Sequence, residues 1–247
     1  MCCFSRPIES VTKTKIFARL ADKEHQYLVY SMQLDSKEDV AMILPIPTPA
    51  KSPEDAVKFI SLKEYADFFP KLNRGFPEPR GGVGSAPKSN HATAEALKVV
   101  EVGSFDASFV PTIADFSRLD ERFRLPSGTW DKLPLDKKFG FAVFKLKAGA
   151  TLVHPMAFRF PTALPDKTFF PTVHIHDGKV HDKAEFDHTL YLQPANADVL
   201  LPDGWEESTQ PAGLYMDLKK ADGIFAADLH CYRHSIVGME KNEDWLV

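Results

Sequence analysis

Four of the nine histidines lie within the nineteen residues from Phe170 to His188, FPTVHIHDGKVHDKAEFDH. Imidazole nitrogen is a common ligand of zinc, copper and iron, so such a cluster is a candidate transition-metal site. Three ligands, His174, His176 and His181, with an open fourth position would have the layout of a catalytic metal centre. The alternative is that these side chains form the solvated face of a sheet.

The pair Asp177-Gly178 inside this stretch is a strong signal for a two-residue hairpin turn. In such a hairpin His174 is opposite His181, and since side chains alternate along a strand, His176 lies on the same face. Opposed residues hold their Cβ atoms about 4.5–5.5 Å apart, and several imidazoles at that spacing can reach one ion at about 2.0–2.1 Å. We therefore predict that these three histidines bind one transition-metal ion, with copper, iron and zinc all open.

Other histidines are candidate additions to this site. His188 follows on the next expected strand, where it could act in catalysis or complete the ligand set. His230 and His234 are four residues apart, which places them on one face of either a helix or a strand, so they are further candidate ligands. The remaining histidines, which we expect to be structural or solvent-exposed, are His25, His91 and His154.

Two adjacent cysteines, Cys2 and Cys3, form a second group that could do chemistry. Their thiolates would suit copper(I) or zinc and could join the histidine cluster. Alternatively, removal of Met1 would leave Cys2 as an N-terminal nucleophile with its own α-amine as base. A third interpretation is that Cys3 packs as a small apolar residue at the start of a strand.

The elements that must position these residues are mostly strands. Alternating apolar residues predict a meander of strands in the first fifty residues, and strands again from residue 138 onward. A helix is expected at about 52–73, with Ser52 as N-cap and Pro70 ending or kinking it, and a second at about 112–123. The fold class is therefore α+β and β-dominated, with antiparallel sheets and a few helices.

The chain length of 247 residues fits a single large domain, 1–247. A Gly- and Pro-rich stretch at 74–90 is the best candidate for a long loop, and it could instead divide the chain into 1–73 and 91–247. We find no repeat at a fixed period.

Composition excludes several classes of partner. The formal net charge of −4 gives no electrostatic reason to bind nucleic acid or an anionic membrane. No apolar run reaches the roughly 20 residues of a spanning helix, and three cysteines are too few for a disulfide scaffold, so we expect a cytoplasmic protein. The 19 phenylalanines predict a Phe-rich core.

Three phrases of the sequence are distinctive: MCCFS at residues 1–5, LPIP at 44–47 and VHIHDGKVH at 173–181. In these phrases the chain resembles a bacterial family of uncharacterised proteins, and the resemblance implies no activity. From the residues, the expected function is a transition-metal-dependent enzyme, redox or hydrolytic, acting on a small-molecule substrate. The alternatives are an N-terminal-cysteine amidohydrolase and a noncatalytic metal-binding or interaction protein.

Overall fold

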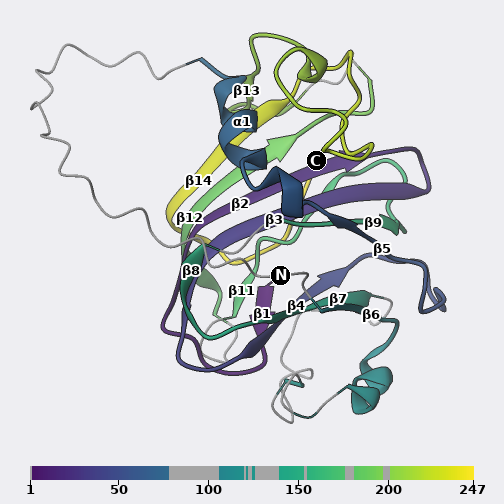
Figure 1. Ribbon diagram of the computed structural model, residues 1–247, viewed down its shortest axis with the longest axis vertical. Helices are drawn as coiled ribbons and strands as arrows, with labels where there is room; N and C mark the ends of the chain where they lie inside the picture. The colour runs from purple at the N-terminus through teal and green to yellow at the C-terminus, as the bar shows by residue number, and fades with distance from the viewer. Residues whose placement is uncertain are drawn as a thin grey trace, which may run out of the picture.

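In the computed structural model the chain forms two large β-sheets that pack face to face (Figure 1). The structure describes residues 2–77, 106–119, 121, 124–125, 139–152, 155–175, 181–196 and 201–247. In these residues the larger sheet comprises β2 (Ser10–Leu20), β3 (His25–Ser36), β5 (Lys58–Ser61), β8 (Gly149–Leu152), β9 (Met156–Pro161), β12 (Lys183–Leu192), β13 (Glu206–Glu207) and β14 (Tyr232–Lys241). Its order is β13-β14-β12-β2-β3-β9-β5, and β8 also pairs with β3.

The smaller sheet has the order β11-β1-β4-β7-β6. Its strands are β1 (Cys2–Phe4), β4 (Val40–Ile46), β6 (Ala107–Val110), β7 (Gly140–Leu146) and β11 (His174–Ile175). A separate pair joins β10 (Phe169–Phe170) to β15 (Trp245–Leu246). Each large sheet takes strands from both sides of residues 74–90. β1 pairs with β11, and β2 with β12, in parallel, whereas the other described pairs are antiparallel. The β-dominated class is confirmed.

The core between the two sheets is rich in phenylalanine, as the composition predicts. Phe158 on β9 and Phe144 on β7 meet with ring centroids 5.8 Å apart, so the rings bridge the sheets. Alternate residues of β4 point into this core and away from it. Met42 belongs to the intersheet cluster, whereas Ile43 belongs to the cluster on the other face of the smaller sheet. β4 is therefore buried on both faces.

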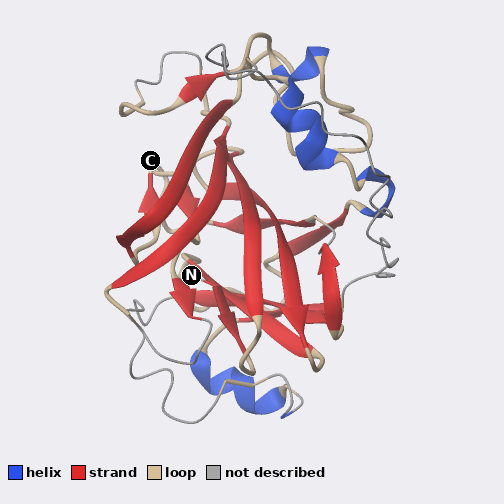
Figure 2. Ribbon diagram, turned by 90° about the vertical axis from the view of Figure 1, so that its left-hand side faces the viewer, coloured by secondary structure: helices blue, strands red, loops and turns tan. Residues whose placement is uncertain are grey.

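Short helices cover the outer faces of the sheets, outside the strands (Figure 2). The larger sheet is covered by η1 (Lys63–Tyr65), α1 (Phe68–Arg74) and the segment that contains η5 (Ala212–Leu214). The smaller sheet is covered by η2 (Ile113–Arg118). Within the described residues, no helix is long and apolar enough to cross a membrane.

The prediction of a helix at about 52–73 is wrong for most of its length. Residues 58–61 form β5 instead, because they pair with the edge of β9 and Phe59 packs against Phe144 and Phe158. The α-helix is confined to Phe68–Arg74. Pro70 lies in its first turn, where a missing N–H leaves no hydrogen bond unmade, so it neither ends nor kinks the helix.

The second expected helix, about 112–123, begins where predicted but is a 3-10 helix, Ile113–Arg118. The Thr112 hydroxyl donates a hydrogen bond to the Asp115 carboxylate at 2.7 Å, and the Asp115 N–H donates to the Thr112 carbonyl at 3.1 Å. The expected opening meander also differs. β2 and β3 pair as predicted, but β4 crosses to the other sheet.

Candidate functional site

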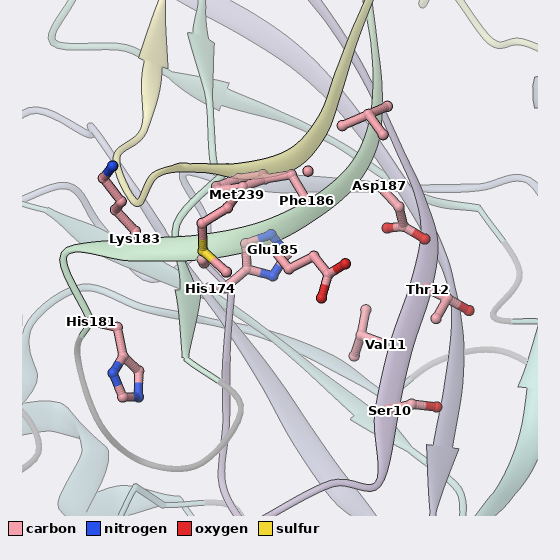
Figure 3. A pocket seen from close by; sticks show the side chains of 13 residues that line it. Ser10, Val11, Thr12, His174, His181, Lys183, Glu185, Phe186, Asp187 and Met239 are labelled. Atoms are coloured by element: carbon pink, nitrogen blue, oxygen red, sulfur yellow. The ribbon is translucent and has the colours of Figure 1, made fainter.

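A groove of about 740 Å³ opens in the larger sheet, between β2 and β12 (Figure 3). Residues 10–12 of β2 form one wall, residues 183–187 of β12 and 237–239 of β14 form the other, and His174 and His181 also line it. This volume is within the range of about 300–1,000 Å³ that is usual for small-molecule pockets. The groove is therefore large enough to bind a ligand.

The groove exists because two parallel strands separate. β12 pairs with β2 only at residues 189–192 and 15–18. Just before that, the β2–β3 register shifts between Thr12 and Lys15, and Lys13 has a φ of 53°, which marks a bulge. The Lys13 N–H donates a hydrogen bond to the Asp187 carboxylate, which closes the groove at this end. Beyond this contact the strands diverge.

Two buried imidazoles meet beside the groove. The His174 ring from β11 and the His188 ring from β12 have centroids 4.4 Å apart at an interplanar angle of 63°. Phe186 packs edge-on against both rings, with centroids 4.5 Å from His174 and 5.1 Å from His188. His188 is 1% exposed and His174 9% exposed, so both rings are almost completely buried from solvent. Of the two, only His174 lines the groove.

His181 is placed differently from this pair. It is exposed, and its ring lies apart from His174 in Figure 3. His176 and the expected turn at Asp177-Gly178 lie outside the described residues. In the described part of the chain β11 pairs with β1 and β12 pairs with β2 and β14, so the two strands belong to different sheets. The structure thus brings His188, and not His181, to the His174 ring.

The N-terminal strand lies directly beside β11. Cys2 is the register partner of His174, and Cys3 is the partner of Ile175, although about 170 residues separate the two strands in sequence. Cys3 is buried in the apolar cluster on the outer face of the smaller sheet, together with Ile175. The structure therefore brings the backbone of Cys2 to His174, while the Cys3 side chain packs as a small apolar residue.

His230 and His234 do not form one site. His230 precedes β14, and its Nδ1 donates a hydrogen bond to the Ser208 carbonyl at 2.7 Å. His234 lies between two tilted indoles, with centroids 5.3 Å from Trp205 and 4.8 Å from Trp245, and its Nδ1 donates to the Gly204 carbonyl at 2.8 Å. These contacts give both rings structural roles.

Sequence reasoning missed one arrangement that superficially resembles a catalytic triad. Ser208, His230 and Glu207 lie together, with the Ser208 hydroxyl 3.5 Å and the Glu207 carboxylate 3.4 Å from the same ring atom, His230 Nδ1. A triad needs the nucleophile and the carboxylate on opposite ring nitrogens. The Ser208 hydroxyl also donates to the Gln210 carbonyl at 2.8 Å, so this group is not arranged for nucleophilic attack.

The third cysteine, Cys231, is buried and its thiol is unreactive. Burial raises the pKa of the Cys231 thiol to about 12, although a hydrogen bond from Tyr215 opposes the shift. The thiol is therefore protonated at neutral pH, and a thiolate is needed for nucleophilic attack or metal binding.

Near the groove, burial lowers the pKa of Lys15, and the charge of Lys13 adds to the effect. His25 is half-buried beside Asp22, and His91 and His154 lie outside the described residues.

Among the described residues, no three His, Cys, Asp or Glu side chains lie close enough together to hold a metal ion. The His174–His188 pair would supply two donors. A metal site here needs at least one more, and Cys2 and His176 are the neighbouring candidates in register and in sequence.

Comparisons with known proteins give distant structural neighbours. No protein-family model matches the chain. The crystal structure of baculovirus P35 is similar with a TM-score of 0.49 and 14% identity, covering 96% of each chain. A structure of the caspase-8/P35 complex is similar with a TM-score of 0.45 and 12% identity, covering 95% of each chain. At this distance we draw no functional conclusion from the likeness.

The side chain of Asn242 positions His174. It accepts a hydrogen bond from the His174 N–H at 2.8 Å and donates to the carbonyls of His174 and His181, each at 3.0 Å. The next residues continue the contact: the Asp244 carboxylate accepts from the Val173 N–H at 3.0 Å. The segment after β14 therefore holds β11 and the residues just before β12 together.

We expect Asn242→Ala to lower the free energy of unfolding by about 1–3 kcal/mol, because three hydrogen bonds of about 0.5–1.5 kcal/mol each are lost and water replaces some of them. Asn242→Asp keeps the acceptor for the His174 N–H but places a carboxylate oxygen, which has no proton to donate, against the carbonyls of His174 and His181, so its loss at neutral pH should be at least as large. Urea unfolding measures both, and amide exchange should speed up at Val173 and His174. A clearly smaller loss in the aspartate variant than in the alanine variant would contradict this role.

Proposed function

We propose that the protein binds one transition-metal ion beside the groove and acts as a metal-dependent enzyme on a small molecule that enters it. The observation that carries the proposal is the contact between the buried rings of His174 and His188, 4.4 Å between centroids. Two imidazoles that bind one ion at about 2.0–2.1 Å each hold their centroids roughly 4.5–5 Å apart. The centroid separation of the pair is close to this range, and the proposal requires one nitrogen of each ring to turn toward a common point.

The ligand set differs from the one expected from the hairpin. His188 takes the place of His181, which is exposed and lies apart from the His174 ring (Figure 3). We propose Cys2 as the third ligand, since it is the register partner of His174, with His176 as the alternative. A thiolate beside two imidazoles favours zinc or copper over magnesium or calcium. Since His174 lines the groove, a substrate could reach an open coordination position.

The test is the metal content of the protein purified without a histidine tag, followed by titration with Co²⁺ at neutral pH. We expect about one equivalent to bind, with the visible bands of a tetrahedral site and a thiolate-to-cobalt charge-transfer band. Cys2→Ser should remove the charge-transfer band and weaken binding. If the purified protein holds no transition metal and binds neither Co²⁺ nor Zn²⁺, the proposal is wrong.

A second candidate function rests on the pairing of Cys2 with His174. An imidazole beside a thiol can lower its pKa and make a thiolate nucleophile, as in cysteine hydrolases. In this case Cys2 would act in catalysis and His174 would be its base. Iodoacetamide would then label Cys2 rapidly, and His174→Ala would slow the labelling with no metal present. Retention of Met1 in active protein would exclude a mechanism that uses the α-amine of Cys2.

A further inference from the structure

The walls of the groove are two strand segments that each lack a neighbour on the groove side. Residues 10–12 of β2 pair with β3, and residues 183–187 of β12 pair with β14. Within the described residues neither segment pairs with a strand across the groove, because the β2–β12 ladder stops at residues 15 and 189. Main-chain groups that point out of such an edge can hydrogen-bond to another extended chain.

We propose that an extended peptide segment of another polypeptide, with basic side chains alternating with apolar ones, adds as a strand between β2 and β12. Strand addition uses main-chain hydrogen bonds for affinity and alternate side-chain positions for specificity. The wall of residues 183–187 is about 17 Å long at about 3.3 Å per residue, so it accepts about five residues of peptide. β2 and β12 are parallel, so one peptide direction serves both edges.

The side chains around the groove indicate which peptide side chains would bind there. Glu185 extends into the space between β12 and β2, whereas Lys183 points away from it (Figure 3). Asp187 lies at the closed end and accepts the Lys13 N–H. A basic side chain on the outer face of the peptide would therefore meet the exposed Glu185 carboxylate.

The inward positions of the peptide meet apolar surface. Val11 is half-buried against the intersheet core, and Phe186 belongs to that core. On the outer face the exposed side chains of Val237 and Met239 flank the groove, 72% and 62% exposed. An apolar residue between two basic ones would point inward onto Val11 and Phe186, since strand side chains alternate between the two faces, and the aliphatic stems of the basic side chains would lie against Val237 and Met239 on the outer face. His174 and His181 also line the groove, but the main-chain hydrogen bonds of the peptide would be made to the two wall strands, so its binding does not require a metal.

The probes are three fluorescein-labelled, acetylated peptides of about seven residues: TKVKVKT, TEVEVET and TKPKPKT. Fluorescence anisotropy with the EDTA-treated protein should show the first binding at least about tenfold more tightly than the other two. The glutamate peptide repels Glu185, and the proline peptide lacks the main-chain N–H donors at its two proline positions. Amide exchange at residues 10–12 and 183–187 should slow when TKVKVKT is bound.

Glu185→Lys should reverse the preference between the lysine and glutamate peptides, because it changes the charge inside the groove. The matched control is Glu240→Lys, the same change at another exposed residue nearby, which should leave the preference unchanged. Equal binding of the three peptides, or an equal effect of the two substitutions, would show attraction by charge alone and would overturn the proposal. Unchanged amide exchange in the two walls would overturn it as well.

Discussion

Replacing His188 with glutamine is expected to lower the affinity for Co²⁺ and Zn²⁺ by more than about 100-fold. The loss should exceed the 10–100-fold effect of removing a group that only orients a ligand, because a donor itself disappears. Glutamine keeps a polar side chain of similar size in a position that is 1% exposed. His174→Ala should have an effect of the same order. Competition with a chromophoric chelator at neutral pH measures both affinities.

The matched controls are His181→Ala and His25→Ala, which remove imidazoles outside the buried pair. Neither should change metal affinity by more than about twofold, a difference of roughly 0.4 kcal/mol. Circular dichroism and urea unfolding confirm that the variants are folded. If His181→Ala weakens binding as strongly as His188→Gln, the ligand set of the sequence-based hairpin is the correct one and the buried pair is structural.

Part of the candidate site could be predicted from the sequence. In residues 183–192 the apolar residues Phe186, Leu190 and Leu192 alternate with polar ones, and His188 falls on the apolar side. That pattern places His188 inside the protein and His181, which precedes the strand, at its exposed end. The density of histidines around the Asp-Gly pair favours the hairpin instead. Periodicity was the more reliable guide to burial.

The residue that lies beside Cys2 could not be predicted in the same way. Adjacent cysteines indicate soft-metal chemistry, but their partner depends on a parallel pairing between strands about 170 residues apart. Such pairing is decided by the packing of the whole sheet and not by local sequence. The groove could not be predicted from the sequence either, because it depends on a bulge near Lys13. The residues TKTK at this point give no recognisable turn signal.

The strands were predicted better than the helices for a physical reason. Alternation of apolar residues reports directly on a half-buried strand, and β2, β3 and β12 follow it. Residues 52–73 carried good helix-start signals, but these are worth only about 1 kcal/mol each. Pairing of β5 with the edge of β9, together with burial of Phe59 against aromatic rings, outweighs that preference.

The largest expected loss of stability is at Phe158. This side chain is 0% exposed, and its ring lies within about 6 Å of the rings of Phe59, Phe144 and Phe160. Phe158→Ala should lower the free energy of unfolding by about 3–5 kcal/mol, because it removes a bulky group and leaves a cavity between the two sheets. For a chain of this size, thermal unfolding should fall by roughly 10 °C.

Phe59→Ala is the matched control, since it removes the same side chain from the same aromatic cluster but at the sheet edge. Phe59 is only half-buried, so water and neighbouring side chains can refill the space, and the loss should be less than half of that at Phe158. Scanning calorimetry and urea unfolding measure both variants. Equal losses would mean that the tightly packed part of the core extends to β5, and that the two sheets are not joined chiefly through Phe144 and Phe158.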